Sequence, residues 1–562
     1  MRRFVPVVLA ALMLLPVGAV SAGAPRTGKA SIRDLDPVRF SLKDAIVERH
    51  LVTARDGITS LAVDVIRPDA KEPVPTIYLQ SPYYNTVGRG YKHETKTPWG
   101  MGGQPAQPSV PFPEWYDEYF VQRGYAVVMS DMRGTRNSSG CQVYGGREEA
   151  TDAVDVIEWI ASQKWSNGSV GMTGGSYDGT VAIAAASEAP KALKAIIPIR
   201  AIDRWYDYHF FNGLQSSQHL LTPWSFTSLT TLQDTQNSLP DDTLFPLHVI
   251  ERKACAASLG ATVSAQYSTP YQDSKSGFWE GRDWVRNAKD FKAATFIIHG
   301  LNDTNVKTTN AAWLWDELPR SLPKKLWLAR MGHADPKQPF PEGEMTFPFD
   351  QRFVEATHRW FAHFLKGIDT GILDEPAVSV QDESGGWHEQ RSWPLASDVR
   401  FSFEGDLLVR GDSKGSLDYR EGSSIRLTSA PMKSDLRISG EAYLRLTYSL
   451  AQGGDTTFAY RLEDVGPDGA TEITTAYARA AYRDDIKRRG LSYPTLPVLH
   501  QPGSTNEISF PFLPQDYVVR AGHRLRLIIA SDDGRVLGDP GGDTVTLDLE
   551  RSALVIPVGP PR

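Results

Sequence analysis

Cysteine is scarce in this chain, and the motifs of common metal sites are missing. Only Cys141 and Cys255 occur among 562 residues. There is no CxxC, HExxH or EF-hand pattern, so neither a metal site nor a cofactor is predicted. Two cysteines can form one disulfide in an oxidising compartment, or both can remain buried thiols. The sequence leaves both possibilities open.

Clusters of positive charge and long apolar stretches are also lacking. The formal net charge is -7 and no Lys/Arg-rich run occurs, which argues against nucleic acid as the main partner. No apolar stretch of 18 or more residues follows Ala22, so no stable membrane anchor is expected. The remaining composition, 41% hydrophobic and 23% charged, is ordinary for a soluble globular protein. The length predicts two or three domains, and nothing indicates an oligomeric state.

The first 22 residues have the pattern of a secretory signal peptide. Arg2 and Arg3 precede an apolar stretch over residues 4–17, and small residues follow at 20–22. The apolar stretch is too short to span a bilayer as a lasting anchor. We therefore expect residues 1–22 to be removed, and the mature chain to be secreted or periplasmic.

Short apolar runs alternate with helical patterns in two parts of the chain, residues 23–200 and 291–371. Buried strands are expected at 76–79, 125–129, 169–172, 195–199, 295–298 and 326–329, and helices at 148–161 and 351–365. The alternation of strand and helix predicts a parallel sheet that is covered by helices on both faces. The acidic residues in the first turns of the helix at 148–161 suit its dipole.

Two other regions have a different pattern. Residues 201–290 are rich in aromatic residues, Ser, Thr and Gln, and we expect them to form a cap over the carboxyl edge of the sheet. After about residue 372, apolar and polar residues alternate between clusters of Gly, Asp, Pro and Asn. This pattern predicts an antiparallel sandwich or jelly roll, forming a C-terminal domain over 372–562.

The strongest chemical signal is the segment GGSYDG at 174–179. It follows a predicted strand and precedes a helix-like run at 180–187. A serine at such a corner sits on a strained turn with its hydroxyl exposed. The spacing is G-x-S-x-x-G, one residue longer than the usual G-x-S-x-G. Ser176 is the predicted nucleophile.

A serine hydroxyl needs a base that takes its proton and a carboxylate that orients the base. Asp303 follows the strand predicted at 295–298, and His333 follows the next one at 326–329. The order Ser, Asp, His along the chain is typical of hydrolases whose fold alternates strands of a parallel sheet with helices. Of the competing histidines, His358 and His363 lie in a predicted helix, and His299 lies beside the predicted acid. The sequence therefore predicts a catalytic triad of Ser176, Asp303 and His333.

The negative oxygen of the reaction intermediate needs hydrogen-bond donors. The backbone N–H of Tyr177, directly after the nucleophile, is the first candidate. No HGGG-type run is present, but Tyr83 follows an early strand and its hydroxyl is the second candidate.

These features resemble the X-Pro dipeptidyl-peptidase family of serine peptidases, which is similar in fold to cocaine esterase and the α-amino-acid ester hydrolases. The stretches that carry the resemblance span almost the whole mature chain and lie at 82–83, 131–135, 139–141, 163–168, 174–177 and 521–527. The resemblance implies an α/β-hydrolase core, an inserted and mainly helical cap, and a C-terminal β jelly-roll domain. It also supports Tyr83 as the second oxyanion donor.

The resemblance extends to the substrate pocket. It implies that Trp205, Tyr208 and Val306 contact the proline ring and that Asn305 hydrogen-bonds the substrate backbone. Peptidases of the lactic type also hold the free α-amino group with a cap carboxylate, for which the candidates here are Asp207, Asp234, Asp241 and Asp242. They have a long helical N-terminal domain as well, for which we expect no counterpart in residues 1–562.

Three functions follow as hypotheses. The first is an exported serine hydrolase that releases N-terminal X-Pro dipeptides through an acyl-enzyme on Ser176. The second uses the same triad on small esters or amides, as in cocaine esterase or the α-amino-acid ester hydrolases. The third is a binding protein whose jelly-roll domain holds sugar or cell wall while the triad is idle.

Overall fold

The computed structural model describes most of the chain after residue 30. The described residues are 31–84, 115–219, 277–333, 351–395, 397–402, 415–487, 490–491, 497–538 and 541–560, with isolated residues between 222 and 262. The expected signal peptide lies outside these residues. Within them, no helix combines the length and the apolar character needed to cross a membrane.

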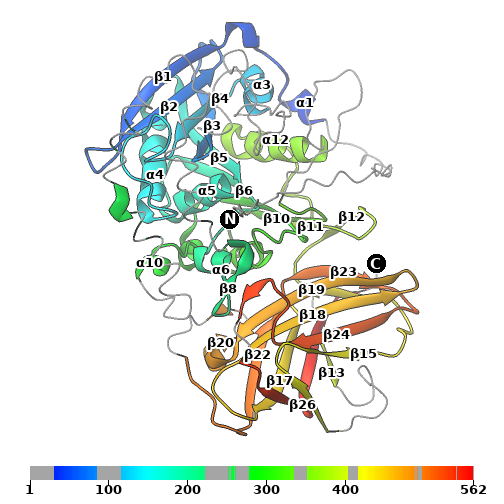
Figure 1. Cartoon of the computed structure of the whole chain (residues 1–562). Helices are drawn as coiled ribbons and strands as arrows, with labels where there is room; N and C mark the ends of the chain where they lie inside the picture. The colour runs from blue at the N-terminus through cyan, green and yellow to red at the C-terminus, as the bar shows by residue number, and fades with distance from the viewer. Residues whose placement is uncertain are drawn as a thin grey trace, which may run out of the picture.

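A ten-stranded mixed sheet forms one half of the molecule, in the order β1-β2-β4-β3-β5-β6-β9-β10-β11-β12 (Figure 1). Its strands are β1 (Ile46–Thr53), β2 (Ser60–Arg67), β3 (Val74–Ser81), β4 (Ala126–Asp131), β5 (Ser166–Gly175), β6 (Leu193–Ile199), β9 (Ala294–Gly300), β10 (Lys324–Ala329), β11 (Val378–Gln381) and β12 (Trp387–Gln390). The strands from β4 to β11 are parallel to one another, as predicted.

The edges of this sheet differ from the prediction of a purely parallel sheet. β1 and β2 pair antiparallel, and β2 joins β4 antiparallel. Only a tight turn, in which the Gly57 amide donates to the Ala54 carbonyl, separates β1 from β2. A parallel connection needs a crossover of a dozen or more residues. The short link between β1 and β2 therefore permits only a hairpin.

Helices cover both faces of the sheet (Figure 1). One face carries α4 (Arg147–Ser162), α5 (Tyr177–Ser187) and α11 (Thr309–Glu317); the other carries α3 (Tyr116–Phe120) and α12 (Gln351–Lys366), with α1 (Ile32–Leu35) against α12. Successive strand residues point to opposite faces, so Tyr78 packs with the first helix layer while Ile77 and Leu79 pack with the second. Both long predicted helices and all six predicted strands are confirmed.

The sheet runs past residue 371, where we expected the core to end. After α12 the chain adds β11 parallel to β10, and β12 completes a hairpin with β11. Trp387 of β12 packs against Trp327 of β10, with ring centroids 5.3 Å apart. The alternating pattern that begins near 372 therefore belongs first to the edge of the mixed sheet, because edge strands and sandwich strands share a two-residue period.

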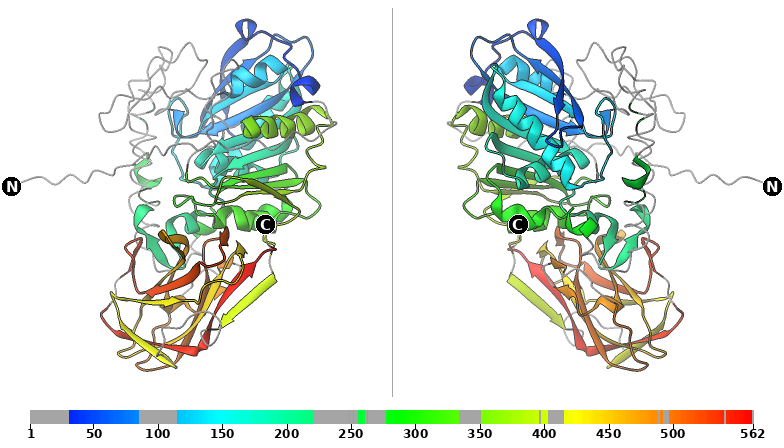
Figure 2. Two further views of the ribbon diagram at one scale, coloured as in Figure 1. Left: turned by 90° about the vertical axis from the view of Figure 1, so that its right-hand side faces the viewer. Right: turned by 90° about the vertical axis from the view of Figure 1, so that its left-hand side faces the viewer.

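The insertion is described in part. Its described elements are α6 (Trp205–His209), β7 (Phe210–Phe211), β8 (Leu214–Ser216) and α10 (Gly277–Glu280), with 3-10 turns at Ser217–His219 and Val285–Asp290. They lie between the mixed sheet and the C-terminal domain in each view (Figures 1 and 2). Cys255 of the insertion forms a disulfide with Cys141, which follows β4.

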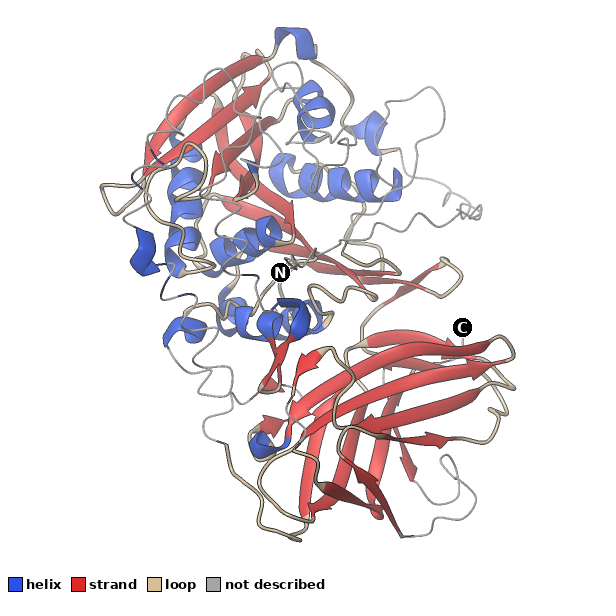
Figure 3. Cartoon of the chain, viewed as in Figure 1, coloured by secondary structure: helices blue, strands red, loops and turns tan. Residues whose placement is uncertain are grey.

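The described strands of the C-terminal domain all pair antiparallel (Figure 3). One sheet contains β13 (Ser397–Ser402), β14 (Ser416–Arg420), β16 (Leu436–Gly440), β17 (Tyr443–Leu450), β22 (Asn506–Pro511), β23 (Gln515–Val519) and β26 (Thr544–Val558), and the other β15 (Ser424–Thr428), β18 (Thr457–Gly466), β19 (Gly469–Arg479) and β24 (Arg524–Ala530). This domain also contains the short strands β20 (Ile486–Lys487), β21 (Gly490–Leu491) and β25 (Val536–Leu537) and a 3-10 turn at Ala480–Tyr482. Two further 3-10 turns, at Leu42–Asp44 and Val121–Arg123, belong to the half of the molecule that holds the mixed sheet. A separate apolar core fills the sandwich. β25 pairs with β8 and so joins this domain to the insertion.

Candidate active site

Ser176 lies at the corner between β5 and α5, in a backbone conformation that is rare for a residue with a side chain. Its φ is 59° and its ψ is -124°. A Cβ atom on Gly174 would lie 2.4 Å from the Cβ of Asp178, and one on Gly179 would lie 2.6 Å from the Gly174 carbonyl oxygen. Both glycines of the G-x-S-x-x-G segment are therefore required by the close contact between strand and helix. That contact holds the strained serine in place.

The structure brings Ser176, His333 and Asp303 together. His333 Nε2 is 3.0 Å from Ser176 Oγ, and His333 Nδ1 is 2.8 Å from Asp303 Oδ2. The imidazole thus lies between the hydroxyl and the carboxylate. A proton on Nδ1 donates to Asp303 and leaves the Nε2 lone pair facing the hydroxyl, so the ring can accept the serine proton.

The backbone fixes the orientation of the Asp303 carboxylate. Its Oδ1 accepts hydrogen bonds from the amides of Asn305 at 2.9 Å and Val306 at 2.8 Å. The Asp303 side chain is fully buried, whereas 23% of the His333 side chain is exposed. One carboxylate oxygen is therefore engaged by the loop, and the other faces the imidazole.

Tyr83 reaches the same place from the end of β3. Its hydroxyl hydrogen-bonds the Ser176 side chain and the backbone of Tyr177. Burial raises the pKa of this phenol, and the two hydrogen bonds offset the rise in part. The hydroxyl therefore keeps its proton at neutral pH and can donate a hydrogen bond to an oxyanion. The amide of Tyr177, the first residue of α5, lies beside it, so both predicted donors are next to the serine.

A buried carboxylate that the sequence analysis did not single out lies behind the nucleophile corner. Glu149 Oε2 accepts hydrogen bonds from the Tyr177 hydroxyl at 2.8 Å and the Gly145 amide at 3.0 Å. Burial raises the pKa of Glu149 to about 7. The sequence showed only an acidic residue in the first turn of a helix, which the helix dipole explains without any burial.

The predicted substrate residues lie close to one another, but they differ in exposure. The Tyr208 hydroxyl donates to Asn305 Oδ1 at 3.0 Å, and the same oxygen is 2.9 Å from His219 Nε2. Trp205 packs against the Tyr177 ring at 4.8 Å between centroids and is 1% exposed, and Val306 is 0% exposed. Asn305 is partly exposed. His219 was not singled out from the sequence, because a lone histidine in a polar segment has no distinguishing pattern.

Of the four candidate carboxylates for a substrate amine, only Asp207 falls among the described residues. Its Oδ2 is 3.1 Å from Arg204 Nη1, and both side chains are buried. Lys307 Nζ bonds the backbone carbonyls of Asp207 and Tyr208. Burial raises the pKa of Asp207 to about 6, while Arg204 and Lys307 lower it. In the described part of the chain, no three Asp, Glu, His or Cys side chains gather as metal ligands would.

The fold and this arrangement define a serine hydrolase with an α/β-hydrolase core. The family model for X-Pro dipeptidyl-peptidase (S15 family) matches residues 56–335. The model for the X-Pro dipeptidyl-peptidase C-terminal non-catalytic domain matches residues 370–556. A protein of Streptomyces avermitilis assigned as an Xaa-Pro dipeptidyl-peptidase is 30% identical over 99% of this chain and 89% of its own length. The chain belongs to the X-Pro dipeptidyl-peptidase (S15) family.

A further relative carries the same family name, and solved structures share the fold. The Xaa-Pro dipeptidyl-peptidase of Lactobacillus delbrueckii subsp. lactis is 26% identical over 91% of this chain and 76% of its own length. A CocE/NonD family hydrolase from Staphylococcus aureus superposes with a TM-score of 0.69 at 17% identity, covering 92% of this chain and 94% of its own. An α-amino acid ester hydrolase superposes with a TM-score of 0.66 at 18% identity, covering 95% and 100%. At these identities the structural matches establish the fold.

Proposed function

We propose that this protein is a serine peptidase that releases X-Pro dipeptides from the N-termini of peptides, with Ser176, His333 and Asp303 as its catalytic triad. The observation that carries the proposal is the His333 imidazole, held between Ser176 Oγ at 3.0 Å and Asp303 Oδ2 at 2.8 Å. The substrate class follows from membership of the S15 family and from the names of the relatives.

The proposed reaction proceeds through an acyl-enzyme. Ser176 Oγ attacks the carbonyl carbon of the proline residue while His333 takes the proton of the serine hydroxyl, and Asp303 keeps the imidazole in the productive orientation. The Tyr177 amide and the Tyr83 hydroxyl stabilise the negative oxygen of the tetrahedral intermediate. The imidazolium then donates its proton to the departing amine. Water repeats the sequence on the ester and frees the dipeptide.

The proposed dipeptide site lies next to this machinery. Tyr208 and Asn305 hydrogen-bond each other beside the acid loop, so they can meet the proline ring and the substrate backbone. Trp205 and Val306 are buried behind them. Because they are buried, Trp205 and Val306 do not reach the proline ring in this proposal but support the pocket from behind, where Trp205 packs against Tyr208 and the Val306 amide holds Asp303.

The test compares three substrates on the wild-type protein and on Ser176→Ala. They are an X-Pro arylamide with a free amine, its N-acetylated form, and an aryl ester without an amine. We expect turnover of the free-amine substrate to exceed that of the other two, and Ser176→Ala to lose it while retaining wild-type thermal unfolding. Preference for the amine-free ester would replace the peptidase with an esterase. Failure of a fluorophosphonate to label Ser176 would leave the idle-triad binding protein.

We further propose that residues 1–22 are a signal peptide and that the mature protein is exported. The Cys141–Cys255 disulfide supports this proposal, because structural disulfides persist in oxidising compartments. Expression of the full chain in a bacterial host, followed by fractionation and N-terminal sequencing, tests it. A mature N-terminus near residue 23 outside the cytoplasm is expected. Intact protein that stays in the cytoplasm would contradict export.

A further inference from the structure

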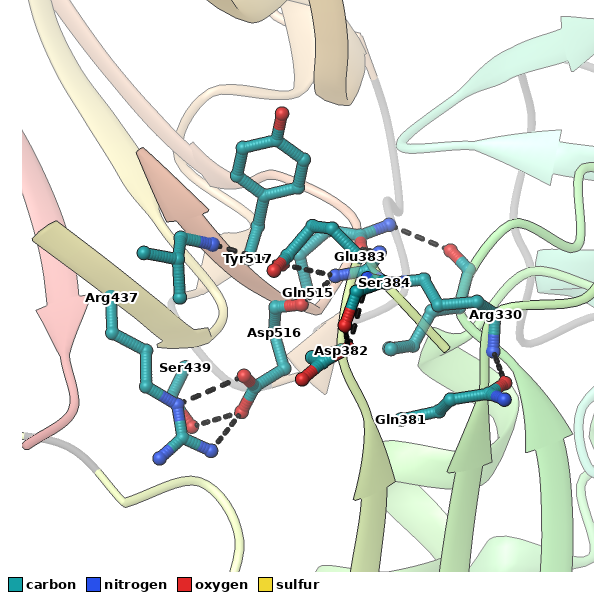
Figure 4. Close-up of polar contacts among 12 residues, drawn as sticks. Arg330, Gln381, Asp382, Glu383, Ser384, Arg437, Ser439, Gln515, Asp516 and Tyr517 are labelled. Atoms are coloured by element: carbon teal, nitrogen blue, oxygen red, sulfur yellow. Dashed lines mark hydrogen bonds and ion pairs between the residues drawn. The ribbon is translucent and has the colours of Figure 1, made fainter. Parts of the chain in front are cut away.

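One side chain of the C-terminal domain contacts both loops that carry the acid and the base (Figure 4). Gln515 is the first residue of β23 and is 5% exposed. Its Nε2 donates to the Leu301 carbonyl oxygen at 2.7 Å, and its Oε1 accepts from Arg330 Nη1 at 3.2 Å. Leu301 lies two residues before Asp303, and Arg330 three residues before His333. The amide thus spans the two loops from outside the mixed sheet.

The two loops are also joined directly. The Leu301 amide donates to the Ala329 carbonyl at 2.8 Å, and the Asn302 amide donates to the Met331 carbonyl at 3.2 Å. A Cβ atom on Gly300 would lie 2.3 Å from the Met331 oxygen, so the loops lie as close as their backbones allow. A small displacement of one loop therefore displaces the other.

Arg330 is held firmly enough to transmit a constraint. Its backbone amide donates to Gln381 Oε1 at 2.8 Å, and its Nη2 donates to Glu383 Oε1 at 2.9 Å and to the Asp516 carbonyl. Glu383 also accepts from the Val518 amide at 2.9 Å, which ties the β11–β12 turn to β23.

The strand that carries Gln515 is anchored on its other side by a buried ion pair. Arg437 on β16 donates to Asp516 Oδ1 at 3.0 Å and to Oδ2 at 2.9 Å, and Ser439 Oγ donates to Oδ2 at 2.9 Å (Figure 4). Arg437 and Asp516 are both buried. The position of the Gln515 amide is therefore set by the fold of the C-terminal domain.

We infer that Gln515 is a positioning residue for catalysis: its side-chain amide fixes the acid loop and the base loop relative to each other, and so holds Asp303 and His333 in contact. The inference rests on the proposed triad. It gives the C-terminal domain, whose family model is described as non-catalytic, a part in the reaction rate, although the hydrogen bonds described for the triad side chains are to residues of the hydrolase core. A purely structural Gln515 would affect stability without changing the turnover of folded protein.

The experiment replaces Gln515 with methionine, which keeps the length of the side chain and removes both hydrogen bonds. The matched control is Gln390→Met, because Gln390 lies at the same interface and its Oε1 accepts from Arg437 at 2.9 Å. Each substitution removes a buried side-chain amide, but only the amide of Gln515 hydrogen-bonds the acid loop and the base loop. Turnover of an X-Pro arylamide is expressed per Ser176 titrated with a fluorophosphonate, so that unfolded protein does not count.

We expect Gln515→Met to lower kcat about tenfold with KM unchanged, and to slow the labelling of Ser176 by the same factor, because loss of reactive geometry affects the transition state alone. Gln390→Met should keep the wild-type kcat. Gln515→Glu is the second variant: it retains the acceptor for Arg330 but sets an oxygen against the Leu301 carbonyl, so its kcat should fall at least as far.

Wild-type kcat per titrated site in Gln515→Met or Gln515→Glu would overturn the inference, whatever the change in thermal unfolding. An equal loss of kcat in Gln390→Met would also overturn it, because the effect would then belong to the interface in general. Ser176→Ala separates the two levels. If that variant keeps turnover, the proposed triad fails; if it is inactive while both Gln515 variants are normal, only the positioning role fails.

Discussion

Removal of the Tyr83 hydroxyl is the most direct test of how the site stabilises negative charge. In Tyr83→Phe the ring stays in place, and only the group that hydrogen-bonds the Ser176 side chain and the Tyr177 backbone is lost. The Tyr177 amide remains as a single oxyanion donor. Loss of one donor costs about 10²–10³ in kcat, or about 3–4 kcal/mol of transition-state stabilisation. KM should change little, because the substrate carbonyl in the ground state carries little of the charge.

Steady-state kinetics on an X-Pro arylamide measure this effect. The matched control is Tyr78→Phe, which deletes a buried hydroxyl on β3, the strand that precedes Tyr83; this hydroxyl lies 2.7 Å from Ser130 Oγ. We expect kcat to fall at least a hundredfold in Tyr83→Phe and to stay near wild type in the control. A kcat within about threefold of wild type in Tyr83→Phe would refute the reasoning, because loss of an oxyanion donor lowers kcat by about a hundredfold or more.

Three further changes test other parts of the structure. Asp303→Asn should lower kcat by about 10⁴ with the fold intact, because the amide can present an N–H donor to the imidazole and so favour the unproductive tautomer of His333. The remaining kcat is measured in assays of long duration, with Ser176→Ala as the blank. Burial raises the Glu149 pKa to about 7 from 4.5, so unfolding releases a proton between these values. Wild-type stability should therefore fall by about 3 kcal/mol from pH 4.5 to 7.5 relative to Glu149→Gln, which urea unfolding across that range checks; parallel curves would contradict it. Replacing Cys141 and Cys255 with serine should lower the free energy of unfolding by about 2–4 kcal/mol, measured by the same method. An unchanged free energy of unfolding would show that the disulfide does not restrict the unfolded chain enough to stabilise the fold.

The proximity of the three proposed triad residues could be predicted because their signals are local in the sequence. Ser176 sits in a glycine segment between a strand and a helix, and Asp303 and His333 each follow a run of buried residues. The carboxyl ends of parallel strands meet at one edge of a sheet, so finding the strands amounted to finding the site. The parallel strands of the mixed sheet and the β domain followed in the same way from the period of the hydrophobic pattern, whereas the antiparallel strands at the edges of the mixed sheet were not predicted.

The supporting residues could not be predicted, because their environment is created by segments far away in the chain. Glu149 has the ordinary pattern of a helix first turn, and only the Tyr177 hydroxyl and the Gly145 amide make it a buried acceptor. Gln515 is one polar residue at the start of a strand, and its role depends on Leu301, which lies 214 positions away in the chain. No periodicity encodes such contacts.

A serine in a strained conformation can be kept only where its neighbours leave it no alternative. Here the geometry of the whole site, and not only of the serine, is constrained from three independent sources. The contact of Gly174 with Asp178 fixes the corner itself, and Glu149 holds Tyr177 from behind. The opposing loops are fixed from the side by Gln515. Because each source lies on a different element, the loss of one should loosen a single component of the site and leave the others, so the effects on turnover should differ in kind as well as in size.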